Sequence, residues 1–269
     1  MFQALILDVD GTLAETERDG HRVAFNRAFA DFSLDWHWDV AAYGELLLVS
    51  GGKERIRHFI ATANPPVPRF ADVDAFVAEL HARKTAHYRD IVRASDLPAR
   101  EGVRRLVDEA RARGVRLAIA TTTSPENVDA LLAAWYGPGW RMIFPVVAAG
   151  DEVERKKPDP QVYALALARL GLNADACVAI EDSAAGLAAA SAAGVDVVLT
   201  RSEYFRHQAH AGALAVLENL GEPGAPACGR VNDANWRGTV TLETIDAWRR
   251  ARRPGGGERA RPAGLARLA

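Results

Sequence analysis

Five short apolar runs alternate with helical segments along most of this 269-residue chain, and this alternation limits the folds it can adopt. The runs have the length and composition of fully buried strands and cover residues 2–7, 115–120, 143–148, 177–180 and 195–199. Ala- and Leu-rich helical stretches lie between them, at about 103–113, 126–135, 161–170 and 184–193. Strands and helices that alternate in this way form right-handed crossovers, and so a parallel sheet covered on both faces. The sequence therefore predicts an α/β fold with a doubly wound, Rossmann-like core.

The alternation is interrupted once, between residues 16 and 93. This segment has amphipathic helical patterns at about 20–31, 53–62 and 73–88, and no convincing buried strand. Ligands of open α/β sheets bind beyond the carboxyl ends of the strands, so an insertion after the first strand covers that site. We therefore expect a core formed by 1–15 and 94–248 and an all-helical cap domain at 16–93. We expect the Arg- and Gly-rich tail, 249–269, to be disordered.

Composition and charge exclude several classes of partner. The formal net charge of -2 gives no reason to expect nucleic acid or an anionic membrane as partner. No apolar run approaches the 18 or so residues of a membrane helix, and the N-terminus lacks the basic lead-in of a secretory signal. Cys177 and Cys228 are too few for a disulfide framework. We expect a cytoplasmic, monomeric protein that binds neither nucleic acid nor membrane.

The first strand ends in the segment Asp8-Val9-Asp10-Gly11-Thr12. Two aspartates two residues apart can be brought together by a turn, and Gly11 permits the positive φ that such a turn can require. One carboxylate can then act as a nucleophile while the other acts as acid and base. A plain Asp-Gly turn is the alternative. A calcium loop is excluded, because Leu13 stands where its glycine belongs and Asp19 where its bidentate Glu belongs.

Three further strand ends carry polar groups. Thr121-Thr122-Thr123-Ser124 precedes a helix, where it provides an anion site or only a helix cap. Lys156-Lys157-Pro158 follows the third strand, and a lysine there can neutralise a transferring phosphoryl group. Glu181-Asp182 follows the fourth strand, where two adjacent acids suit a hard metal ion or a helix cap. Because these groups all follow strands of one parallel sheet, a purely structural explanation fits them poorly.

The segments DVDGT, IATTTS, KKPDP and AIEDSAAG resemble, in order and spacing, the four motifs of the haloacid dehalogenase-like (HAD) hydrolase superfamily. The segments LAETERDGHRVAFN, SGGKERI and TTTSPENV are also similar to CbbY-type proteins, which hydrolyse the Rubisco inhibitor xylulose 1,5-bisphosphate. The resemblance covers roughly residues 1–220. It implies a Mg²⁺-dependent phosphatase that acts on a small sugar bisphosphate.

The resemblance also implies roles for residues of the core. Asp8 attacks phosphorus and forms an aspartyl-phosphate, and Asp10 protonates the leaving oxygen and then activates water. Mg²⁺ is held by the carboxylates of Asp8 and Asp182 and by the backbone carbonyl of Asp10. Glu181 supports these ligands and does not bind the metal itself. Thr121 and Lys157 hold the phosphoryl oxygens. Lys156 is the weaker candidate, because the motif lysine directly precedes proline.

The cap is expected to supply specificity. Ser50-Gly51-Gly52-Lys53-Glu54 places two glycines and a cation at a helix start, for phosphate capture or as a tight turn with a solvated lysine. His81 and Lys84 share one helix face, and with Arg83 nearby they form a second candidate phosphate site, although such pairs commonly lie on the surface. Glu17 is expected to bond a sugar hydroxyl, and the substrate also contacts residues of the second motif (Thr121, Thr122, Thr123 and Asn127). His207 and His210 are expected on the surface.

Two alternatives to a phosphatase stay open. A β-phosphoglucomutase carries the same four motifs and returns the phosphoryl group to a sugar. A non-catalytic phosphosugar-binding protein belongs to a different class, and the presence of both Asp8 and Asp10 argues against it.

Overall fold

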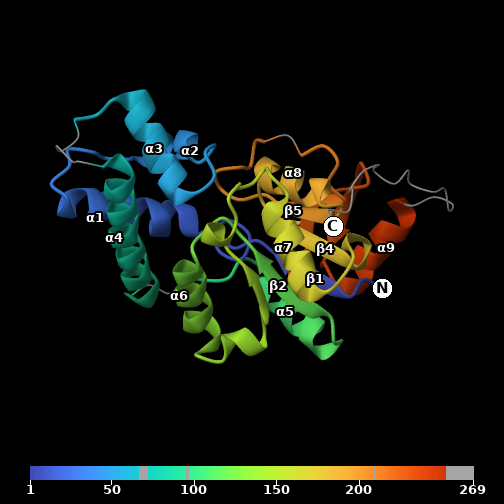
Figure 1. The fold of residues 1–269 in the computed structure, drawn as a ribbon. Helices are drawn as coiled ribbons and strands as arrows, with labels where there is room; N and C mark the ends of the chain where they lie inside the picture. Colours follow the sequence, from blue (N-terminus) through green and yellow to red (C-terminus); the bar gives the residue numbers. More distant parts are fainter. Residues whose placement is uncertain (67–71, 95–96, 209, 253–269) are drawn as a thin grey trace, which may run out of the picture.

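The computed structural model describes residues 1–66, 72–94, 97–208 and 210–252. Its centre is one sheet with the strand order β3-β2-β1-β4-β5-β6-β7-β8, partly visible in Figure 1. The strands are β1 (Ala4–Leu7), β2 (Arg116–Ala120), β3 (Val146–Ala148), β4 (Cys177–Glu181), β5 (Asp196–Thr200), β6 (Ala215–Leu217), β7 (Ala227–Val231) and β8 (Ala234–Gly238). The pairs from β3 to β6 are parallel, and β7 and β8 add an antiparallel hairpin. The predicted α/β class is confirmed.

Helices cover both faces of the sheet, because successive side chains of each strand point to opposite faces. Leu5 and Leu7 pack in one apolar cluster with α5 (Val103–Ala112), α6 (Pro125–Tyr136) and α9 (Leu242–Arg252). Ala4 and Ile6 pack in the other with α7 (Gln161–Leu170) and α8 (Ala184–Ala192). Strand β1 therefore lies between two apolar layers, which fixes the position of the acidic segment that follows it.

Four of the helices between β1 and β2 stand as a group beside the core (Figure 1). They are α1 (Arg22–Asp31), α2 (Val40–Leu46), α3 (Gly52–Ala63) and α4 (Val73–Ala94). Their interior is rich in aromatic rings, with Trp38 packed between Phe25 and Phe29 at centroid distances of 4.7 and 4.8 Å. This all-helical insertion is where the sequence predicts the cap. The exact domain boundaries stay a prediction.

The C-terminal part of the chain differs from expectation in three ways. Strands β6 to β8 and helix α9 were not predicted, although they extend the sheet and cover one of its faces. The expected start of a disordered tail at residue 249 is wrong, because α9 continues to Arg252 and Arg249 is buried against Asp196 at 2.9 Å. His210 was expected on the surface and is buried. Residues 253–269 of the predicted tail lie outside the described residues.

The longest described helix is α4, with 22 residues, and it carries acidic and basic side chains along its length. Among the described residues, no helix combines the length and the apolar character needed to cross a membrane.

We predict that Trp248→Ala destabilises the protein by about 3 kcal/mol or more, because it leaves a cavity between α9 and β8. Trp248 is 7% exposed and packs edge-on against Trp236, with ring centroids 5.0 Å apart. Urea unfolding measures the change. Arg250→Ala on the same helix is the control, because its ion pair with Asp246 is largely exposed on the Arg250 side and should change stability by less than about 0.5 kcal/mol. Equal effects of the two changes would show that α9 is not part of the core.

Candidate active site

The polar groups predicted at four strand ends meet at one edge of the sheet. Asp8 follows β1, Thr121 follows β2, Lys157 precedes α7, and Glu181 and Asp182 come at the end of β4. The ammonium of Lys157 lies 2.7 Å from Oδ1 of Asp8 and 2.5 Å from Oε1 of Glu181. Asp8, Asp10, Thr121, Lys157 and Asp182 all line one cavity, which we call the core cavity. The structure therefore brings together the core residues that the sequence predicts.

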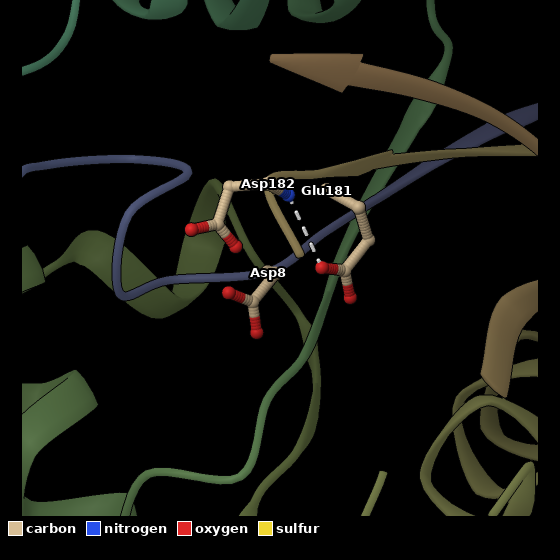
Figure 2. A group of neighbouring side chains, drawn as sticks. All are labelled: Asp8, Glu181 and Asp182. Atoms are coloured by element: carbon tan, nitrogen blue, oxygen red, sulfur yellow. Dashed lines mark hydrogen bonds between the residues drawn. The ribbon is translucent and has the colours of Figure 1, made fainter. Parts of the chain in front are cut away.

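Figure 2 shows three of these carboxylates, Asp8, Glu181 and Asp182, grouped at the ends of β1 and β4. One oxygen of each lies within 4.8 Å of the others, and all three side chains are buried. Burial raises the pKa of Asp8 to about 7, with Lys157 opposing the rise and Glu181 adding to it. Burial, together with the charges of Asp8 and Glu181, raises the pKa of Asp182 well above its usual range. With all three carboxylates ionised, the group would therefore carry more negative charge than Lys157 compensates.

Asp182 shows that the group suits a divalent cation. Its Oδ2 atom is buried and has no hydrogen-bond partner of normal geometry within the described part of the chain. An unpartnered buried carboxylate oxygen is costly, and a hard cation such as Mg²⁺ takes oxygen ligands of this kind. Asp8 and Asp182 are the carboxylates available for it. The oxygens of Glu181 already accept hydrogen bonds from Lys157, from the Tyr163 hydroxyl at 2.6 Å and from the Asp182 backbone.

Two glycines make room for these acids. Gly11 has a φ of 80°, and a Cβ there would lie 2.0 Å from Oδ2 of Asp182. Gly186, in the first turn of α8, faces Glu181, and a Cβ there would lie 1.9–2.3 Å from the Glu181 carboxyl atoms. The turn predicted at Gly11 is thus confirmed, and the glycine of EDSAAG is required by the approach of the glutamate. Glu181 in turn holds Lys157, whose ammonium also donates to the Ala120 carbonyl at 3.0 Å.

Asp10 points away from this group, toward the cap. Its Oδ1 accepts hydrogen bonds from Thr16 at 2.5 Å and from Nε2 of His21 at 2.8 Å. Lys84 of α4 lies 2.7 Å from the other ring nitrogen of His21, so the lysine donates there and His21 carries its proton on Nε2. Burial would raise the pKa of Asp10, but His21 and Thr16 lower it to about 2. Asp10 is therefore a carboxylate in this arrangement.

The cap residues line a second cavity, which shares Asp10, Glu17, Arg55 and Thr122 with the core cavity. We call it the cap cavity. The predicted residues on its wall are Glu17, Gly51, Gly52, Lys53, Glu54, His81, Lys84, Thr122, Thr123 and Asn127, and Ser50 lines the core cavity. The ammonium of Lys53 lies 3.1 Å from Oδ2 of Asp151, at the end of β3. Lys53 thus connects the cap to the core at the wall of the cap cavity.

The second candidate phosphate site differs from the prediction. Arg83 does not face either cavity; it pairs with Asp31, because residue 83 lies about 200° around α4 from residue 81. His81 is buried, and burial with the nearby charges of Lys84 and Lys53 lowers its pKa to about 3, so it is a neutral hydrogen-bonding group. Lys84 is buried rather than on the surface, and its ammonium donates a hydrogen bond to His21.

Sequence reasoning missed three residues of the site. His21 and Tyr163 hold Asp10 and Glu181, respectively, and each lies within a helical pattern that gives no sign of a polar role. Arg55 lines both cavities and donates to the Tyr43 hydroxyl, which itself donates to Glu17 at 2.5 Å. Arg55 lies within the segment SGGKERI that resembles CbbY-type proteins, and this was the available signal.

Comparison with known proteins agrees with this geometry. The profile of the haloacid dehalogenase-like hydrolases matches residues 2–194. The protein CbbY of Cupriavidus necator, encoded on a plasmid, is 47% identical over 92% of this chain and 96% of its own length. This chain is a haloacid dehalogenase-like hydrolase of the CbbY type. A phosphoglycolate phosphatase of Rhodospirillum rubrum is 33% identical over 83% of this chain and 90% of its own.

Among solved structures, the hydrolase is similar to a variant of CbbY from Rhodobacter sphaeroides in complex with xylulose 1,5-bisphosphate. The two share 42% identity and a TM-score of 0.77, over 81% of this chain and 95% of the other. The hydrolase is a phosphatase of this family. Residues beyond the family match, including β6 to β8 and α9, complete the sheet of the core.

We predict that Gly186→Ala lowers kcat about 100-fold, because the added methyl group displaces Glu181 and with it Lys157. Alanine is otherwise favoured over glycine in a helix by about 1 kcal/mol, so the folded state should persist. Phosphate release measures the activity and thermal unfolding the stability. Ala188→Ser, at an exposed position of the same helix, is the control. An unchanged kcat with raised stability would show that Glu181 does not position Lys157.

We predict that Asp182→Asn raises the melting temperature of the metal-free protein at neutral pH by about 3 °C or more, since it removes a buried acid whose ionised form the folded state disfavours. We expect millimolar Mg²⁺ to stabilise the wild type and the same change to abolish that effect, because a candidate ligand of the cation is lost. Thermal unfolding with and without Mg²⁺ measures both effects. Asp108→Asn, whose carboxylate is 65% exposed, is the control. A variant that Mg²⁺ still stabilises as strongly as the wild type would contradict the assignment of Asp182.

Proposed function

We propose that this hydrolase removes one phosphate group from a small sugar bisphosphate, with xylulose 1,5-bisphosphate as the best candidate, and that it requires Mg²⁺. The observation that carries the proposal is the presence of cations at two separate places along the connected cavities. Lys157 stands beside Asp8 in the core cavity, and Lys53 stands in the cap cavity. A substrate with phosphate groups at both ends matches this arrangement. The bound ligand of the R. sphaeroides relative has this form.

Asp8 is the proposed nucleophile. Lys157 donates to its Oδ1, which orients the carboxylate and leaves Oδ2 available to attack phosphorus. The new bond joins this oxygen to phosphorus while the bond from phosphorus to the sugar oxygen breaks. Although burial lowers the pKa of Lys157, Asp8 and Glu181 raise it well above its ordinary value, so the lysine stays charged throughout. Lys157 and Thr121 are placed to hold the phosphoryl oxygens as they move.

Asp10 is the proposed acid and base. In the first step it must carry a proton for the leaving sugar oxygen, and this proton weakens its acceptance of hydrogen bonds from His21 and Thr16. In the second step it is a carboxylate, as in the described arrangement, and takes a proton from the water that attacks the aspartyl-phosphate. Asp8 is then regenerated and phosphate leaves.

Mg²⁺, when bound by the carboxylates of Asp8 and Asp182 and the backbone carbonyl of Asp10, would neutralise charge between the nucleophile and the phosphate. The cap residues Glu17 and Arg55 line both cavities and are placed to contact the middle of the sugar. His81, being neutral, is placed to hydrogen-bond the distal group without adding charge.

We predict Mg²⁺-dependent phosphate release from xylulose 1,5-bisphosphate, with no conversion of glucose 1-phosphate to glucose 6-phosphate. Asp8→Asn should lower kcat by a factor of about 10³ or more, because the nucleophile is lost. Conversion of glucose 1-phosphate would support a mutase. Tight sugar-phosphate binding without turnover, unchanged by Asp8→Asn, would support a binding protein and overturn the proposal.

Substrate choice is tested by Lys53→Gln. It should raise the KM for the bisphosphate about 10-fold or more while leaving the KM for xylulose 5-phosphate nearly unchanged, since only the bisphosphate has a group for Lys53. Arg57→Gln, on the exposed side of the same helix, is the control of equal charge. A KM that rises equally for both substrates would contradict the role of Lys53 in distal phosphate binding.

A further inference from the structure

A further cavity, distinct from the core and cap cavities, lies beside the part of the sheet that the family match does not cover. Between β5 and β6 the chain crosses over through residues 201–214 without a helix in its described part. This leaves a cavity of about 460 Å³ next to β6 and β7, closed on one side by the end of α9. A volume of this size accommodates a small metabolite. The residues that line it come mainly from elements that the sequence analysis left unassigned.

The walls of this cavity are strongly basic. Arg201, Arg230 and Arg252 line it, and Asp233 is the carboxylate on its described wall. Arg230 donates to the backbone carbonyl of Asp233 at 2.5 Å and Arg252 to that of Gly212 at 2.8 Å. Neither guanidinium has a carboxylate within 4.0 Å in the described residues, so their charges stay uncompensated. Arg201 is partly compensated by Glu218, which lies 3.4 Å away and also pairs with Arg206.

His210 adds an unpartnered polar group to the same wall. Its side chain is about nine-tenths buried, and neither ring nitrogen has a hydrogen-bond partner of normal geometry in the described part of the chain. Buried polar groups in native proteins are normally paired, and an orphan group of this kind indicates a missing partner. The cavity therefore offers three guanidinium groups and one imidazole to an occupant that brings acceptors.

We infer that this cavity is an anion site, separate from the active site, that takes the phosphate group of a small phosphorylated metabolite. Arginine binds phosphate oxygens in pairs, and a doubly charged group balances the excess of positive charge here better than a single carboxylate does. Gln208 lines both this cavity and the core cavity, and its side chain accepts a hydrogen bond from the Ala184 backbone at the start of α8. A molecule bound in this cavity would thus be separated from the core cavity by the side chain of Gln208.

The inference is tested by titrating the full chain with inorganic phosphate in a calorimeter. Up to three phosphate ions should bind per wild-type chain, one beside Lys157 in the core cavity, one beside Lys53 in the cap cavity and one beside the arginines. Arg230→Gln and Arg252→Gln should each weaken one class of site about 10-fold or more, because each removes a charge-assisted hydrogen bond. The kcat and KM for the sugar phosphate should stay within about twofold of the wild type, because neither arginine lines the catalytic cavities.

Arg237→Gln is the matched control, since it removes the same charge from an exposed position of the same hairpin, outside the cavity. It should leave every class of site intact. Phosphate binding that neither Arg230→Gln nor Arg252→Gln changes would overturn the inference. So would equal weakening by Arg230→Gln and Arg237→Gln, because binding would then depend on net charge alone.

Discussion

Three carboxylates, those of Asp8, Glu181 and Asp182, share one buried space with a single lysine, and much of the molecule near the sheet edge follows from this crowding. Lys157 compensates two of them directly, at 2.7 and 2.5 Å, and leaves Asp182 without a partner for one oxygen. Two glycines, Gly11 and Gly186, give the acids the space they occupy. Burying three ionised carboxylates beside one lysine is unfavourable, and a bound cation would compensate the remaining negative charge. Preorganised charge of this kind is what phosphoryl transfer requires.

The same electrostatic balance extends from the core into the cap through one histidine. Asp10 belongs to the segment after β1, Lys84 belongs to α4 of the cap, and His21 bonds to both. His21 also stacks on Tyr88, with ring centroids 4.1 Å apart. The charge state of Asp10 therefore depends on cap residues as well as on its own strand. Because an acid-base group must change its proton during the reaction, the contact between cap and core becomes part of the chemistry.

The sequence is a good guide where structure follows from local pattern. Buried strands and the polar groups after them were predictable, since period and position determine them, and Asp8, Thr121, Lys157 and Asp182 meet as expected. The prediction for Arg83 was wrong, because residues 81 and 83 lie on opposite sides of a helix. The hairpin β7–β8 turns at Asn232 and Asp233, both with positive φ, and this pair was its overlooked signal. His21 and Tyr163 could not be predicted from local pattern, because their partners are distant in sequence.

The four lysines of this arginine-rich chain show why residue type matters at these positions. The ammonium of Lys157 contacts Asp8, Ala120 and Glu181 around a single atom, a geometry that suits a compact charge and not a planar fork. Lys84 is enclosed similarly, with its ammonium 4.8 Å from the ring centre of Phe25 and 5.3 Å from that of Tyr88. Burial lowers its pKa to about 8, although Glu17 and Asp10 oppose the change. A planar guanidinium matches neither enclosure, because each is built around a single compact charged atom, so lysine at these two sites reflects the space around them.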